Sequence, residues 1–371
     1  EHTFQVDFTT PFDSIHTLEA GAKYILRDNS SENDRYTMAA MDGGGYEFDE
    51  DHSSHYKHRN DILAAYLGYG IKWKRLSGRL GLRYEHTIQD VKYLLGRGDD
   101  FRKDFDDIVP SASIGYRLTD TQNLRLGYNM RIYRPGIWYL NPYLNDADPT
   151  SISQGNPNLV SEKTHSFSLG YNSFTSKLSL NLNLAYSFTN NSIESVTSLV
   201  NDNDIAGLQS PTGKSLLYTT YRNIGKTRRA SLNAYANYNP FTSTRIYANM
   251  FGSWQYLSDG NGLSNRGWNM FASGGVQQTL PQDWRISFNW WGPTPRILLQ
   301  GKGGGFFGYG LNVTKQLLKK RLTLSVYANN FFKKYMDYDD TTSSTSFTQR
   351  SWSRYVQQRF GLSVSFRIGE L

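Results

Sequence analysis

The sequence contains no cysteine, which excludes disulfide scaffolds, thiolate metal sites and cysteine nucleophiles. Long apolar runs are also missing: the longest, residues 63–71, is half the length that a membrane-spanning helix needs. With a mean hydropathy of −0.58, a helical membrane protein is therefore excluded. Disorder is excluded as well, because 15% of the residues are aromatic, including 26 Tyr.

The chain lacks an initiator Met, a basic leader and an apolar leader segment. Its first residues, 1–8, already alternate like a strand. We therefore expect a fragment or a processed chain, in which a missing leader says nothing about location.

The net charge of +7 does not indicate nucleic-acid binding. Nucleic-acid-binding proteins gather Lys and Arg in a patch. Here the 40 basic residues are spread over the whole length, with short clusters at turns such as 72–75 and 319–321. We expect no nucleic-acid partner.

The dominant pattern is an alternation of period two. In residues 177–188 every even position is apolar, whereas the odd positions are mostly small or polar. The same pattern occurs in residues 79–88, 322–329 and 360–368. Because alternate side chains of a strand face opposite sides, the pattern predicts a sheet with one apolar face and one polar or glycine face. No window predicts a helix.

The connections alternate between short and long. Short turns are expected near residues 11–13, 75–76, 120–122, 175–176, 241–242, 281–283 and 319–320. Long polar loops are expected at 28–58, 92–104, 135–161, 198–214, 257–265, 292–305 and 336–348. These connections separate about fifteen strands. Short turns at one end and long loops at the other are typical of a transmembrane β-barrel. The alternative is a soluble multi-sheet protein such as a propeller, but no blade-length repeat supports it.

One further feature favours the barrel, and another indicates that strands are missing from it. Aromatic residues flank the short turns, as an interfacial girdle requires: Phe12, Trp73, Phe174, Phe241 and Trp284. The strand count is odd, whereas bacterial single-chain barrels have an even number. The first strand would also run toward a short turn, so we expect that at least one strand precedes it.

Residues 131–162 read RIYRPGIWYLNPYLNDADPTSISQGNPNLVSE, and residues 221–226 read YRNIGK. The first segment resembles the barrel of TonB-dependent receptors, in particular the Bacteroidetes outer-membrane β-barrel family, with its "R-P", "L-N-P", "D-P" and "G-N-P-x-L-x-x-E" elements. The second resembles the "Y-x-N-(I/V)-G" element of the same barrels. As a barrel pattern the resemblance covers essentially the whole chain.

The resemblance implies an all-β fold: an antiparallel transmembrane β-barrel of which residues 1–371 are the last part of about 22 strands. It also implies a preceding plug domain and a segment that contacts TonB, neither of which lies in this chain. Family members often begin with a carboxypeptidase-regulatory-like domain. The terminal residues, 367–371, depart from the family because they do not end in an aromatic residue.

One cluster contains metal-ligand side chains. His52, His55 and His58 recur at three-residue spacing after Asp49. Imidazole and carboxylate suit Zn²⁺ or Ni²⁺. Three-residue spacing converges only on a helix, however, and these residues lie in a Gly-rich region, so a solvated loop is the preferred interpretation. We expect no resident cofactor.

Two other sets are candidates for contacts in the intact protein. Trp138, Tyr139 and Tyr143 could contact a sugar ring or a peptide, although bracing of their own loop is the preferred interpretation. Candidates for the lumen, where they could contact a plug, are Arg125, Arg131 and Arg222.

The alternation and turn pattern predict an outer-membrane-type β-barrel, and the resemblance implies a Gram-negative outer-membrane receptor that takes up a scarce nutrient with energy transmitted through TonB. Its expected partners are outer-membrane lipid, the plug, TonB, a small-molecule or oligomeric ligand and a surface lipoprotein. The alternatives are a passive porin and a surface adhesion or secretion-associated barrel. No enzyme is expected, because no G-x-S-x-G nucleophile pattern occurs.

Overall fold

A computed structural model describes residues 1–38, 45–96, 98–146, 148, 150–208, 211–260, 262–344 and 347–368. Almost all of the secondary structure is strand. Within the described ranges, no helix has the length and apolar character needed to cross a membrane.

The elements are mainly strands, with short helical turns in two of the connections. The helical turns are α1 (Ile137–Leu140) and η1 (Asp202–Asp204). The strands are β1 (His2–Pro11), β2 (His16–Met38), β3 (Tyr46–Trp73), β4 (Leu76–Leu95), β5 (Phe101–Arg117), β6 (Gln122–Tyr133), β7 (Leu144–Asn145), β8 (Ser151–Gln154), β9 (Glu162–Phe174), β10 (Leu178–Asn201), β11 (Ser215–Phe241), β12 (Thr244–Ser258), β13 (Ser264–Leu280), β14 (Trp284–Pro293), β15 (Ile297–Leu298), β16 (Gly301–Lys302), β17 (Gly308–Leu317), β18 (Leu322–Asn329), β19 (Tyr335–Ser343), β20 (Thr348–Val356) and β21 (Arg359–Phe366).

The large sheet has 17 described strands. Two of them, β7 and β8, are short pieces of one long connection; the other fifteen pair antiparallel with their neighbours from β1 round to β21. Strands β15, β16, β19 and β20 form a second sheet of four strands beyond the end of β14, β17, β18 and β21. The expected fold class and strand count are therefore confirmed.

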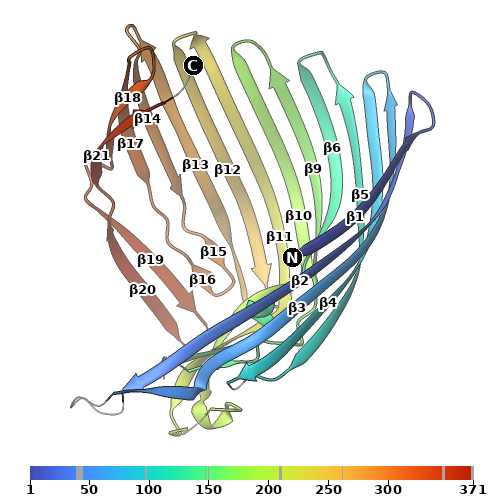
Figure 1. The fold of residues 1–371 in the computed structure, drawn as a ribbon, viewed down its shortest axis with the longest axis vertical. Helices are drawn as coiled ribbons and strands as arrows, with labels where there is room; N and C mark the ends of the chain where they lie inside the picture. Colours follow the sequence, from blue (N-terminus) through green and yellow to red (C-terminus); the bar gives the residue numbers. More distant parts are fainter. Residues whose placement is uncertain are drawn as a thin grey trace.

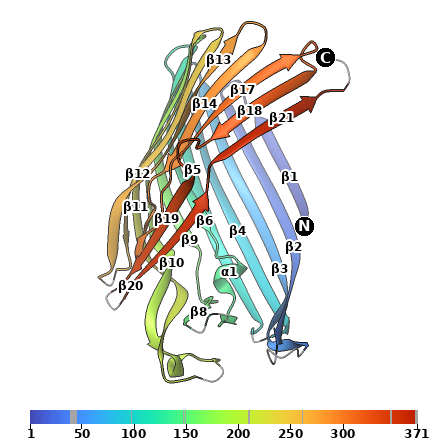
Figure 2. The ribbon, with the colours of Figure 1, turned by 90° about the vertical axis from the view of Figure 1, so that its left-hand side faces the viewer.

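The sheet curls around a hollow but does not close among the described residues. There β1 is hydrogen-bonded only to β2, and β21 only to β18. Figures 1 and 2 show the open side between these two edges. The expected barrel of about 22 strands stays a prediction.

The short turns all lie at the same end of the sheet, at the top of Figure 1, as predicted. The five aromatic residues beside them are all exposed: Phe12, Trp73, Phe174, Phe241 and Trp284. Two of the predicted long loops are wrong in detail. Much of 28–58 extends the β2–β3 hairpin, and 336–348 is mostly the β19–β20 hairpin. Such hairpins project beyond the bilayer, so they need no apolar face and resemble loops in sequence.

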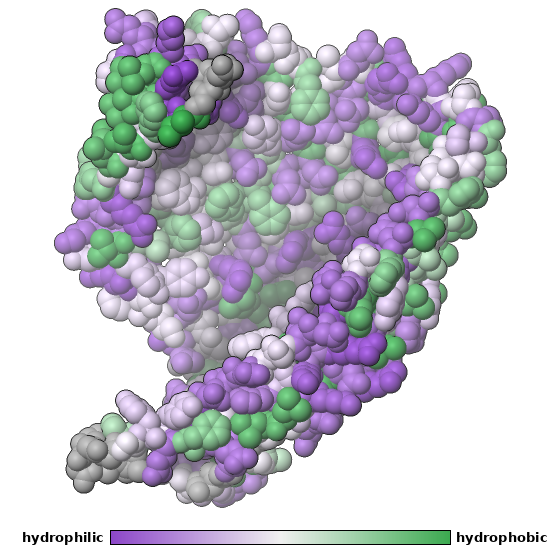
Figure 3. Space-filling model, in the orientation of Figure 1, coloured by the Kyte–Doolittle hydropathy of each residue, from purple (hydrophilic) through white to green (hydrophobic). Residues whose placement is uncertain are grey.

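The two faces of the sheet differ as predicted. On the convex face the apolar side chains are exposed, as for Leu184 and Tyr186 of β10. Gly115 and Gly127 lie on the concave face among polar groups: a Cβ added to Gly115 would lie 2.6 Å from Ser77 Oγ, and one added to Gly127 would lie 2.9 Å from Ser168 Oγ. Figure 3, viewed from the open side, shows a hollow lined by hydrophilic and intermediate residues with scattered hydrophobic ones.

Candidate ligand-binding site

The connection between β6 and β9, residues 134–161, folds back into the hollow at the end with the long connections. It contains α1, β7 and β8, which lie inside the curl of the sheet in both views (Figures 1 and 2). We call residues 134–161 the inner segment. It covers most of the motif that resembles the receptor barrels.

An ionic contact at one end and a hydrogen bond at the other fasten the inner segment to the wall of the sheet. Arg134 contacts the carboxylates of Glu85 at 2.6 Å and Asp107 at 3.2 Å. Asp107 also contacts Lys163 Nζ at 3.3 Å and accepts a hydrogen bond from Ser161 Oγ at 3.2 Å. Only 2% of Asp107 is exposed, so this carboxylate is desolvated and depends on its two cationic partners.

The inner segment also has a small apolar core of its own. Leu144 and Ile152 are buried together with Leu216 of β11. Strand β8 pairs parallel with β11, where Leu217 is opposite Ser151. Leu140 is completely buried as well. This core and the ionic contacts give the segment a defined position, unlike a solvated loop.

The two sequence motifs contact each other. Asn223 of the second motif accepts a hydrogen bond from the backbone N–H of Val160 at 2.8 Å and donates one to its carbonyl at 2.9 Å. Asn156 donates to the carbonyl of Tyr221 at 2.8 Å. A Cβ on Gly155 would lie 2.3 Å from the carbonyl oxygen of Asn141, so glycine is required at this close backbone approach.

Glu162, the last residue of the first motif, fixes the start of β9. Its carboxylate accepts a hydrogen bond from the backbone N–H of Ile193, where the β10–β11 register shifts. Burial raises the pKa of Glu162. Glu162 therefore accepts the hydrogen bond of a backbone N–H that the irregular β10–β11 ladder does not use.

A cavity of about 570 Å³ lies between the extended β2–β3 hairpin and the inner segment. Its walls are mainly amide, hydroxyl and aromatic side chains, with few charges. They include Ser31, Asn33, Asp34, Arg35, Tyr36, His52, Ser54, Tyr56, Trp138, Asn141, Tyr143, Asn145, Gln154 and Tyr221. A few polar groups that converge on an aromatic-lined concavity are typical of small-molecule sites.

The predicted aromatic candidates have different environments. Trp138, in α1, is 76% exposed, and its indole N–H donates to Tyr221 Oη at 3.2 Å. Tyr139 packs edge-on against Tyr221, with ring centroids 4.8 Å apart. Tyr143 Oη donates to the carbonyl of His52 at 2.9 Å. Tyr139 and Tyr143 therefore make bracing contacts, whereas Trp138 presents its ring to solvent.

The three histidines lie on β3, where residues at three-residue spacing face different sides. The Nδ1 atom of His52 is 2.7 Å from Asp49, and its Nε2 atom is 3.5 Å from Asp146. His55 contacts Asp34 at 2.6 Å, and His58 is buried. The structure does not bring the three imidazoles together. Nowhere in the described ranges do three His, Asp or Glu residues form a group that could hold a metal ion.

The arginine candidates are exposed and lie on two strands. Arg125 and Arg131 are on β6, and Arg125 donates to Ser113 Oγ at 3.1 Å. Arg222 is on β11, opposite Glu194 of β10. Their contact with a plug stays a prediction.

The sequence profile of the outer membrane protein beta-barrel family matches residues 1–366. The chain belongs to this family. Its location is accordingly the outer membrane, as predicted. The resemblance to an outer-membrane barrel family is thus confirmed, whereas the Bacteroidetes assignment stays a prediction.

Solved structures of other barrels share the fold of this family member. The ferric yersiniabactin uptake receptor FyuA from Yersinia pestis has a TM-score of 0.67 at 16% identity, covering 98% of this chain and 53% of that one. The ferric citrate transporter FecA has 0.66 at 16% identity, covering 98% and 54%. The copper transporter OprC has 0.65 at 15% identity, covering 98% and 56%. The chain therefore spans about half the length of these proteins. Among curated protein sequences none matches it.

Sequence reasoning missed several residues that line the cavity of this family member. Asn33, Asp34 and Tyr36 fall in the long polar loop expected at 28–58, where no binding role is predicted for them. Asn141 and Gln154 lie inside the recognised motif but had no assigned role. The motif itself could have indicated these residues. A motif with a fixed residue pattern between two strands is more consistent with a packed element than with a loop tip.

Proposed function

We propose that this chain is the barrel portion of an outer-membrane receptor that takes up a scarce nutrient, and that the cavity beside the inner segment is its outer binding site. In the intact protein a plug would fill the hollow, and TonB would supply the energy for transport. The observation that carries the proposal is the packed inner segment, which presents Trp138 beside a polar cavity at the end with the long connections. The uptake receptor and transporters of the same fold support it.

The test replaces Trp138 by Ala in the full-length protein. Because the exposed ring contributes stacking area and little packing, we expect normal folding and roughly a tenfold loss of ligand-dependent growth or uptake. The matched control is Trp352→Ala, which removes an exposed Trp from β20, outside the cavity. Growth is compared on the nutrient for which the wild-type gene is required, with and without TonB.

Uptake that persists without TonB would contradict the energised mechanism and favour a porin. Equal uptake by the Trp138 and Trp352 variants would contradict the assignment of the cavity while leaving transport intact. The two parts of the proposal can therefore fail separately.

A further inference from the structure

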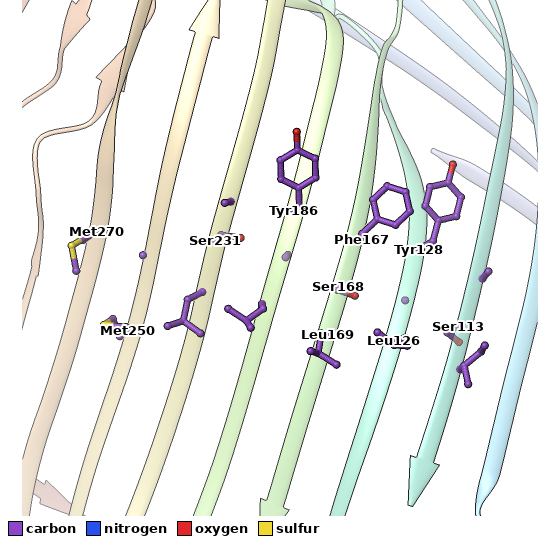
Figure 4. Close-up of a pocket in the computed structure, with 18 of the residues that line it drawn as sticks. Ser113, Leu126, Tyr128, Phe167, Ser168, Leu169, Tyr186, Ser231, Met250 and Met270 are labelled. Carbon is purple, nitrogen blue, oxygen red and sulfur yellow. The ribbon is translucent and has the colours of Figure 1, made fainter.

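A shallow groove with a volume of about 840 Å³ crosses the convex face of the sheet. It runs over the strands from β5 to β13, and Figure 4 shows several of its lining side chains. The lining is almost entirely apolar, and the residues that shape it include Tyr186, Ala230, Leu232, Gly252 and Met270. This face meets the membrane and not the hollow.

The floor of the groove is made by small residues between larger ones. In one cross-strand row, Ala230 lies between Tyr186 and Trp254; in the next, Gly252 lies between Leu232 and Met270. A Cβ added to Gly252 would meet no atom within 4 Å. The outer surface is therefore indented here, whereas a uniform row of large side chains would leave it level.

An aromatic ladder borders the groove on the side of the long connections. The rings of Tyr128 and His165 are stacked 6.2 Å apart, and those of His165 and Phe188 are stacked 4.8 Å apart. The guanidinium of Arg228 lies 5.4 Å from the Phe188 ring centroid. Arg228 also donates to Asn190 Oδ1 at 2.9 Å, so its side chain is held in place. Aromatic residues of this kind mark the membrane–water boundary.

Basic side chains lie just beyond this boundary. Arg228 is opposite Tyr256, and Tyr256 is opposite Arg266 on the next strand. Arg228 is also opposite Phe188, so the register partners of these two arginines are aromatic and not acidic. Since neighbouring strands are about 4.8 Å apart, the two arginines start about 10 Å apart and can reach one phosphorylated head group.

We propose that this face binds a phosphorylated lipid of the outer leaflet. The phosphate contacts Arg228 and Arg266, and an acyl chain occupies the groove above Gly252. The charge and the apolar indentation are adjacent on one face, which matches an amphiphile with an anionic head and a hydrocarbon tail. This inference does not depend on the proposed uptake.

The test uses the full-length protein in dodecyl maltoside, titrated with lipid A and followed by native mass spectrometry. Replacing Arg228 and Arg266 by Gln is expected to weaken lipid A binding roughly 25-fold, because each cation near an anionic head group contributes about fivefold. The matched control replaces Arg125 and Arg229 by Gln. Arg229 contacts Gln255, whose amide donates to the Ile297 carbonyl inside the barrel, so this double variant loses the same charge away from the groove.

A second variant, Gly252→Leu, fills the groove without altering charge. We expect it to weaken binding of both lipid A and dephosphorylated lipid A, whereas the arginine variant weakens only the former. Heat-modifiable mobility on cold SDS gels confirms that each variant is folded. The proposal would be overturned if the control double variant lost as much lipid A binding as the Arg228 and Arg266 variant. It would also be overturned if that variant or Gly252→Leu bound lipid A like the wild type, or if this face cross-linked to another polypeptide in place of bound lipid.

Discussion

Leu184→Arg is expected to destabilise the membrane-inserted protein by about 2–4 kcal/mol, the cost of Arg on the lipid face near the bilayer midplane. Leu184 is 53% exposed on the convex face. It lies six residues beyond Leu178, where β10 begins after a short turn. At a rise of about 3.3 Å per residue and a tilt of about 40°, this distance is roughly 15 Å along the bilayer normal.

The control is the adjacent substitution Asn183→Arg, which places the same charge on the concave face. The Asn183 side chain lies on the face that lines the hollow, because its Nδ2 atom is 3.8 Å from the position of a Cβ added to Gly170. Urea titration of the full-length protein in lipid vesicles gives both free energies of unfolding. If Asn183→Arg lowered the free energy of unfolding more than Leu184→Arg does, the assignment of the lipid face and the hollow face would be reversed.

Asp107→Asn is expected to undock the inner segment. The substitution removes the buried carboxylate charge that Arg134 contacts beside Glu85 and that the half-exposed Lys163 also contacts. Losing one buried contact to a charged group costs about 2 kcal/mol, which is about thirtyfold in the population of the undocked segment. Residues 135–161 contain no Lys or Arg but several aromatic residues, so chymotrypsin cleavage measures this population.

Asp106→Asn is the matched control for this prediction. Asp106 is the neighbouring carboxylate, 63% of its side chain is exposed, and it contacts His86 away from the inner segment. We expect its cleavage rate to remain within about twofold of the wild type, as for exposed ion pairs. Equal cleavage of the two variants would mean that Asp107 does not hold the segment.

The sequence alone predicts the parts of the fold that depend on local alternation. Residues 177–188 show both faces of β10, and the turn at 175–176 marks its start as the structure has it. The β2–β3 extension was missed because its polar residues pair outside the membrane, where no apolar face is required.

The candidate site was predictable only in part, because its parts come from distant strands. Trp138 was identifiable as an aromatic in a recognised motif, but its exposure follows from the packing of Tyr139 on Tyr221. In the sequence nothing distinguishes Asp107 from other polar residues of β5. Its role depends on the contact with Arg134, which the folded inner segment brings to it. These contacts join residues that no local pattern relates.

The most direct test of the account is the orientation of the barrel in the membrane. Residues 1–371 contain no cysteine, so single cysteines introduced here are compared with the unsubstituted full-length protein as the labelling background. Asn203→Cys places a thiol in the connection between β10 and β11, and Ser176→Cys places one in the short turn before β10. Both residues are exposed.

The full-length variants are treated in intact cells with a maleimide that does not cross the outer membrane. The account predicts that Asn203→Cys is labelled at once, and Ser176→Cys only after the outer membrane is disrupted. Labelling of Ser176→Cys in intact cells, with Asn203→Cys protected, would contradict the placement of the cavity at the cell surface.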